Sequence, residues 1–191
     1  IGRNLTEHFS SLANYEVHAV WHVCQPYEIE NVIWNHGDLR NSEDVERLVL
    51  GMDIVVQAAA TTSGSKDIVT RPYIHVTDNA IMNSLLLRAA FDYHVDHFVF
   101  FSCTVMYSSS ENALSELDFD ASAELHPRYF GAGWTKVYVE KMCDFFSRMG
   151  CTRHTVIRHT NIYGPHDKYD LERSHVFGAT VAKVMTSDEI I

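Results

Sequence analysis

The sequence predicts an α/β fold in which a doubly wound parallel sheet forms a single domain over residues 1–191. Apolar segments of strand length alternate with amphipathic segments of helix length along the chain. The segments Asp53–Gln57 and His97–Ser102 are too uniformly apolar for strands with one wet face, which favours a sheet covered on both sides. A third strand-like segment, Thr155–Ile157, leads to the corner Tyr163-Gly164-Pro165 and a polar loop. A strand that ends in such a loop is typical of the ligand-binding edge of an open α/β sheet.

Helical and strand-like patterns alternate in the first part of the chain. Leu5, Phe9 and Leu12 have helical spacing, and Ser42 can cap a later helix that Gly51 ends. The expected elements are, in order, a helix near Leu5–Leu12, strands at Glu16–His22 and Asn31–Trp34, a helix from Ser42 to Gly51 and a strand at Asp53–Gln57.

The second part of the chain continues the alternation. The expected elements are a long helix at about Ile74–Phe91, a strand at His97–Ser102, a helix at Gly133–Arg148 that Gly150 ends, a strand at Thr155–Ile157 and helical spacing from Val176 to Val184. No repeat or linker interrupts this order.

Composition argues against several classes of function. The net charge is −10 and no basic cluster occurs, which argues against a nucleic-acid partner. No apolar run approaches the roughly 20 residues of a membrane span. The four cysteines form no CxxC pair and no metal-ligand spacing, so we expect free thiols, a cytoplasmic protein and no metal site. Because the chain opens at Ile1 in what reads as the first turn of a helix, we expect a fragment that lacks the first strand and most of a C-terminal substrate lobe.

Several residues are suited to a dinucleotide. Gly2, which opens an amphipathic helix, suits the third glycine of a GxxGxxG turn, where the helix packs on the sheet and its amino terminus faces a pyrophosphate. Asp38 follows a strand and can accept a hydrogen bond from an adenine amino group. The triplet Ala58-Ala59-Ala60 leaves the backbone open to a nicotinamide or ribose. Trp21-His22-Val23 stands where an acid would hold a ribose 2′-hydroxyl, so NAD and NADP both stay open.

A second set of polar groups follows the strand at His97–Ser102. Ser102, Cys103 and Thr104 lie at its carboxyl end, where hydroxyls and thiols face the crevice of an α/β sheet.

The motif Arg158-x-x-Asn161-x-Tyr163-Gly164-Pro165 resembles that of the extended short-chain dehydrogenase/reductases, the NAD-dependent epimerase/dehydratase family that acts on nucleotide sugars. The continuation His166-Asp167 and then Ser174-His175-Val176 is similar to the GDP-L-fucose synthase-like branch. The segment Ala58–Asn79, with the alanine triplet, Gly64 and Pro72, is similar to the same branch without a gap. The resemblance implies a Rossmann-type domain with bound NAD or NADP.

The resemblance also implies roles for individual residues. It assigns Asp38 and Leu39 to the adenine, and Asn79, Ser102 and Asn161 to the cofactor pocket. Cys103 occupies the place of the substrate-oriented Ser or Thr, and Thr104 beside it is the better hydrogen-bond donor. His175 falls on the acid/base histidine of the branch. Val105 stands where the branch has a catalytic cysteine, which sets its epimerisation chemistry apart from this chain.

Lys136 matches the lysine that holds the nicotinamide ribose and lowers the pKa of a catalytic phenol one helical turn earlier. That earlier position is Ala132, and the sequence contains no Tyr-x-x-x-Lys. Tyr129 is the nearest substitute. Gly131 and Gly133 weaken the helix start, and a late start near Trp134 would let Tyr129 fold back over the site.

These observations predict an NAD(P)-dependent nucleotide-sugar epimerase, reductase or dehydratase that works through a 4-keto sugar. In this hypothesis the strand ends near Ala60, Cys103 and Arg158 converge on one nicotinamide pocket with Lys136 at its floor. The alternative is a non-catalytic dinucleotide-binding sensor or scaffold that lost its tyrosine, and an atypical ketone dehydrogenase for small substrates also stays open. The resemblance further implies a nucleotide-sugar ligand and a homodimer through a four-helix interface of helices 74–91 and 131–149.

Overall fold

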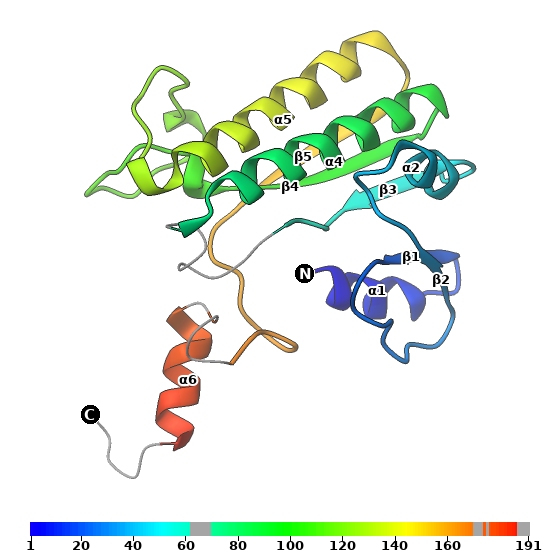
Figure 1. Cartoon of the computed structure of the whole chain (residues 1–191), viewed down its shortest axis with the longest axis horizontal. Coiled ribbons are helices and arrows are strands. Elements are labelled where there is room, and N and C mark those ends of the chain that lie inside the picture. The colour runs from blue at the N-terminus through cyan, green and yellow to red at the C-terminus, as the bar shows by residue number, and fades with distance from the viewer. Residues whose placement is uncertain (62–69, 170–173, 175, 187–191) are drawn as a thin grey trace.

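The computed structural model describes residues 1–61, 70–169, 174 and 176–186. Helices and strands alternate along the chain, except that the first two strands follow one another without a helix between them (Figure 1). The strands are β1 (Val17–Trp21), β2 (Val32–His36), β3 (Ile54–Gln57), β4 (His97–Cys103) and β5 (Arg153–His159). The α-helices are α1 (Gly2–Ser10), α2 (Ser42–Val49), α4 (Tyr73–Asp92), α5 (Phe130–Met149) and α6 (Val176–Thr186). Short 3₁₀ helices are η1 (Thr104–Met106), η2 (Glu116–Asp118) and η3 (Pro127–Tyr129).

All described strand pairs are parallel, as the sequence predicted. β1 pairs with β2 in one sheet, and β3, β4 and β5 follow in that order in another. This arrangement fits the doubly wound order 3-2-1-4-5-6 if β1 and β2 take positions 2 and 3 and the other strands take positions 4 to 6. No strand of the described residues occupies position 1, between β1 and β3.

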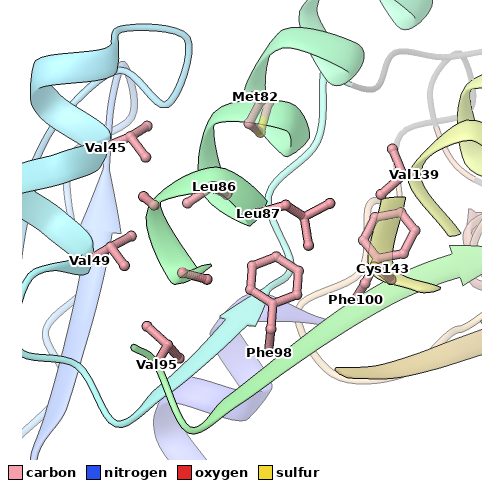
Figure 2. Close-up of a cluster of buried hydrophobic side chains, with 12 residues drawn as sticks. Val45, Val49, Met82, Leu86, Leu87, Val95, Phe98, Phe100, Val139 and Cys143 are labelled. Carbon is pink, nitrogen blue, oxygen red and sulfur yellow. The ribbon is translucent and has the colours of Figure 1, made fainter. Parts of the chain in front are cut away.

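The main core lies between the β3-β4-β5 sheet and the helices α4 and α5, which lie side by side over it (Figures 1 and 2). Alternate residues of β4 point into this core, and Phe98 and Phe100 are at most 2% exposed. Leu87 of α4 and Val139 of α5 pack in the same cluster. The period-two alternation of a strand thus decides which side chains of β4 meet the helices.

The face of this sheet that lies away from α4 and α5 is partly exposed in the described residues. Ile54, Val56 and Ile157 are between 38% and 45% exposed. The described helices α4 and α5 pack on the other face, which leaves these apolar side chains in contact with solvent.

Two helix starts differ from the sequence prediction. Asn41, rather than Ser42, caps α2, because Asn41 has an extended backbone and its side-chain oxygen accepts a hydrogen bond from Asp44 N at 3.1 Å. Helix α5 starts at Phe130 rather than near Trp134. We attribute the early start to packing, as a Cβ at Gly133 would stand 2.9 Å from the carbonyl oxygen of Val105.

Glycine at position 133 therefore lets α5 lie directly against η1, and this contact outweighs a helix-propensity cost of roughly 1 kcal/mol. Tyr129 becomes the N-cap of a regular helix. Its Cα lies about 10.5 Å along the axis from that of Lys136, at a rise of about 1.5 Å per residue. The late start that would have folded Tyr129 over the site does not occur.

No helix of the described residues is both long enough and apolar enough to cross a lipid bilayer.

Candidate active site

The carboxyl ends of three strands meet at one edge of the β3-β4-β5 sheet. Gln57 is in register with Phe100, and Cys103 is in register with His159. The segments that follow β3, β4 and β5 therefore leave the sheet together, which confirms the predicted convergence of strand ends. Ala59, Ala60 and Thr104 are exposed at this edge.

The amino terminus of α1 lies at the same edge. A Cβ built on Gly2 would be 3.7 Å from the Cβ of Ala58. Asn4 Nδ2 donates to the carbonyl oxygen of Pro165 at 3.2 Å, and His166 Nε2 lies 3.0 Å from a carboxylate oxygen of Glu7. These contacts join the start of α1 to β3 and to the Gly-Pro corner after β5.

This edge fits a dinucleotide. The N–H groups that open α1 carry the partial positive charge that suits a pyrophosphate. The exposed alanines after β3 leave room for a flat ring or a sugar against the backbone. The contact at Gly2 is an ordinary van der Waals distance, so the described surroundings accept a larger residue there, and the steric need for glycine that the sequence suggested is not seen.

Lys136 points from α5 toward the end of β4. Its Nζ donates to the carbonyl oxygen of Phe101 at 2.7 Å and lies 4.7 Å from the centre of the Phe100 ring. Burial lowers the pKa of Lys136, while the charges of Cys103 and Glu140 act in the opposite direction. The ammonium is thus held beside the strand ends and not in bulk water.

Asp38 is held in an ionic cluster at the end of β2. Arg40 donates to both of its carboxylate oxygens at 2.8 to 2.9 Å, and His22 Nε2 lies 3.6 Å away. Arg40 also reaches Asp78 of α4 at 3.1 Å. The hydrogen bonds from Arg40 hold the pKa of Asp38 far below its usual range. The Asp38 side chain keeps 32% of its surface exposed, which leaves it open to a further donor.

Three residues that were predicted to bind the cofactor make contacts within the fold instead. The Asn79 amide accepts from Thr61 N and donates to Thr61 O and His75 O, so it fixes the segment after β3 on α4. The Leu39 side chain packs against the core. Ser102 is 0% exposed, because it shares the helix-facing side of β4 with Phe98 and Phe100. The prediction that the Ser102 side chain faces the crevice is therefore wrong.

The residues after Ser102 face outward. Cys103 is half-buried at the end of β4, and Thr104 is exposed. Thr104 and Thr160 line a cavity of about 280 Å³. Asn161 is exposed in the segment after β5. His175 lies outside the described residues, so its predicted role stays a prediction.

The structure adds a polar cluster that the sequence reading did not predict. Arg158 of β5 makes a forked ion pair with Glu140 of α5, with contacts of 2.7 to 3.2 Å. The pair is 22% and 11% exposed. Arg158 Nη1 also donates to the Tyr107 hydroxyl at 3.0 Å. The hydrogen bond to Glu140 raises the pKa of Arg158, which keeps it charged.

A sequence signal for this cluster existed. Arg158 directly follows Val156 and Ile157 near the end of a strand, and Glu140 lies four residues after Lys136, on the same face of one helix. A buried arginine requires an acidic partner, and Glu140 is placed to supply it.

Comparison with known proteins identifies the family. The model of the NAD dependent epimerase/dehydratase family matches residues 1–191, and the chain therefore belongs to this family. This confirms the resemblance that the motifs indicated, and it confirms NAD or NADP as the cofactor class at the level of the family.

Among curated proteins, the chain is 26% identical over 172 residues to a GDP-L-fucose synthase of Azorhizobium caulinodans, covering 86% of this chain and 51% of that protein. It is 25% identical over 139 residues to a GDP-L-colitose synthase of Yersinia pseudotuberculosis, covering 72% of this chain and 45% of that protein. The chain thus spans about half the length of the curated relatives that it matches.

Solved structures support the Rossmann-type fold. A UDP-glucose 4-epimerase of Thermotoga maritima has a TM-score of 0.75 at 24% identity, covering 93% of this chain and 57% of that one. A GDP-mannoheptose C4 reductase of Campylobacter jejuni, solved with NADP bound, has a TM-score of 0.71 at 21% identity, covering 81% and 46%. At these identities the likeness shows the fold.

Proposed function

We propose that the complete protein binds NAD or NADP at the shared strand edge and acts as a nucleotide-sugar reductase, epimerase or dehydratase through a 4-keto sugar. The observation that carries this proposal is the position of Lys136, whose ammonium is held at the end of β4, on the edge of the sheet where β3 and β5 also end. The relatives named as nucleotide-sugar synthases support the substrate class.

The chain's own residues divide the work as follows. The start of α1 and the alanines after β3 hold the dinucleotide, and Asp38 accepts from its adenine. Lys136 donates to the ribose next to the nicotinamide and offsets negative charge that develops on the sugar oxygen. Thr104, beside Cys103, orients the substrate. The bound nicotinamide supplies the hydride chemistry, which no side chain provides.

Lys136→Met tests this proposal in the full-length protein with NADPH and GDP-4-keto-6-deoxymannose or its dTDP counterpart. We expect turnover to fall by about 100-fold or more and NADPH affinity to weaken, because a positioned charge-stabilising donor contributes about that much and Lys136 also binds the ribose. Lys141→Met, on the exposed side of the same helix, is the matched control and should keep turnover. Equal activity of the Lys136 variant and the wild type would reject the proposed role.

A non-catalytic sensor or scaffold is the second candidate, and Ala132 favours it because no phenol stands one turn before Lys136. The same assay separates the two candidates. Tight NADPH binding without turnover on either nucleotide sugar supports the sensor, and turnover rejects it.

We also propose a homodimer through the outer faces of α4 and α5. Large apolar side chains are exposed at helical spacing on both helices: Tyr73 and Ile81 on α4, and Phe130, Tyr138 and Phe145 on α5. Ser84 Oγ and Tyr138 Oη lie 3.3 Å apart, so the two rows form one surface. A second copy would bury this surface in a four-helix contact.

The free thiols of all four cysteines agree with the reducing cytoplasm that we propose as the location of the protein.

A further inference from the structure

Reduction of a ketone needs a proton donor as well as a hydride. The family's position for that donor holds Ala132 in this chain, and alanine has no hydroxyl. We propose that Tyr107 donates this proton, with Arg158 as its positioning residue. The inference deepens the proposed function and rests on it. The observation behind it is a single arrangement at the strand ends, in which Arg158 holds the Tyr107 hydroxyl and both residues line the cavity that Thr104 and Thr160 also line.

Tyr107 occupies a fixed place at this edge. It follows η1, which begins directly after β4, and its N–H donates to the carbonyl oxygen of Thr104 at 3.1 Å. Its ring packs edge-on against Phe119, with the ring centres 5.6 Å apart. The ring is therefore held by local backbone and by packing, with its hydroxyl beside Arg158.

Arg158 determines where the proton of Tyr107 points. A guanidinium only donates hydrogen bonds, so the Tyr107 oxygen accepts from Arg158 at 3.0 Å and its own O–H stays available. Among the described residues no acceptor takes the proton of this hydroxyl. A carbonyl oxygen of a ligand in the cavity would be that acceptor.

Glu140 makes the position of Arg158 firm. The forked ion pair fixes the guanidinium plane, and Glu140 stands one helical turn after Lys136 on α5. Because Glu140 offsets much of the charge of Arg158, Arg158 acts mainly by orienting the Tyr107 hydroxyl and less through its electric field. One helix thus fixes both Lys136 and, through Glu140, the partner of Tyr107.

The proposed step is balanced. Tyr107 transfers its hydroxyl proton to the carbonyl oxygen while the carbonyl carbon receives a hydride, which carries two electrons, from the reduced nicotinamide. The C=O double bond becomes a CH–OH group, the nicotinamide is oxidised, and Tyr107 remains as a phenolate beside Arg158. Solvent that reaches the cavity then returns a proton to Tyr107.

Tyr129 is the rival phenol, and its position is less suitable. It caps α5 about two turns before Lys136, is 37% exposed, and its ring meets that of His126 at 5.6 Å. Among the described residues its hydroxyl has no cationic partner. Tyr107 has such a partner and lines the cavity.

The test compares Tyr107→Phe, Tyr129→Phe and the wild type in the full-length protein, with Tyr93→Phe as a control whose hydroxyl lies near Glu46, away from the strand ends. With NADPH and GDP-4-keto-6-deoxymannose or its dTDP counterpart, we expect Tyr107→Phe to lower kcat by about 100-fold and to leave the KM for NADPH within about twofold. Arg158→Lys should lower kcat by a smaller factor with the same KM. A purely structural role would lower the melting temperature without this split.

A binding measurement without cofactor separates this inference from the proposed function. By calorimetry, Tyr107→Phe should bind the 4-keto nucleotide sugar about tenfold more weakly, because one hydrogen bond to the carbonyl is lost, and should bind GDP or dTDP as the wild type does. Equal affinity for the keto sugar, or loss of kcat in Tyr129→Phe alone, overturns the role of Tyr107. A wild type that binds the keto sugar through Tyr107 and never turns it over contradicts the proposed function instead.

Discussion

Asp38 shows how much of a candidate site is decided by a single neighbour. The sequence places this acid after a strand. In the structure its carboxylate pairs with Arg40, which donates to both carboxylate oxygens and also to Asp78 on α4. The cluster therefore joins the end of β2 to α4, in addition to any contact with adenine. Its contribution to stability depends on the charge of Asp38.

A pH-dependent effect of Asp38→Asn follows. Because the folded pKa of Asp38 lies well below its unfolded value of about 3.9, the stabilisation is fully present above that value and is lost only as the pH falls through the folded pKa. Near pH 7 the variant should melt at a lower temperature, by the equivalent of at most about 1 kcal/mol because the pair is partly exposed. The gap should persist to about pH 4 and close in stronger acid.

Thermal melts of the variant and the wild type across this range provide the measurement. Asp144→Asn is the matched control, because Asp144 pairs with Arg148 in an exposed helical pair. Identical melts of the Asp38 variant and the wild type at neutral pH would show that the cluster adds nothing to stability.

Single residues also mark where sequence reasoning stopped. The place of Ser102 at the end of a strand was predictable, but its buried side follows from the alternation of Phe98 and Phe100 into the helices. The pairing of Arg158 with Glu140 joins residues 18 positions apart, and the packing of α5 against β5 brings their side chains together. The hydrophobic period and the residue types predict where a residue lies along a helix or strand. Which residues of different elements contact one another becomes known only from the fold.

At the scale of elements, α5 shows tertiary packing overriding local propensity. Two glycines predicted a late start, yet the helix begins at Phe130 because Gly131 and Gly133 allow close contact with α4 and η1. The long helices and the apolar strands were predictable in type and order, because their periods are clear over many residues.

The outer face of α4 and α5 yields a prediction about assembly. The full-length protein should be a dimer at micromolar concentration, and Tyr138→Arg should shift it toward monomer, because a charge would enter the apolar centre of the contact. Light scattering with size-exclusion chromatography measures this. Leu50→Arg, at a 61% exposed apolar residue outside both helices, is the control and should stay dimeric. A monomeric wild-type protein would contradict the proposed interface.

At the scale of the whole molecule, the two parallel sheets keep the doubly wound order with position 1 unfilled by the described residues. Val20 of β1 and Val56 of β3 are 42% and 38% exposed, although strands of this type are usually buried in parallel sheets. The predicted first strand, placed before Ile1, would pair with both sheets. Its existence stays a prediction.

Although the strands form two separate sheets, the predicted site joins parts of both. The start of α1, the end of β3 and the corner after β5 are in contact, and Lys136 reaches the end of β4 beside them. The central claim is that this edge is the cofactor site and that Lys136 serves it.

A crystal structure of the full-length protein with bound NADP tests that claim most directly. We expect the pyrophosphate at the amino terminus of α1 and the nicotinamide ribose within hydrogen-bonding distance of Lys136 Nζ. A dinucleotide bound elsewhere, with Lys136 Nζ still donating only to the carbonyl oxygen of Phe101, would contradict it.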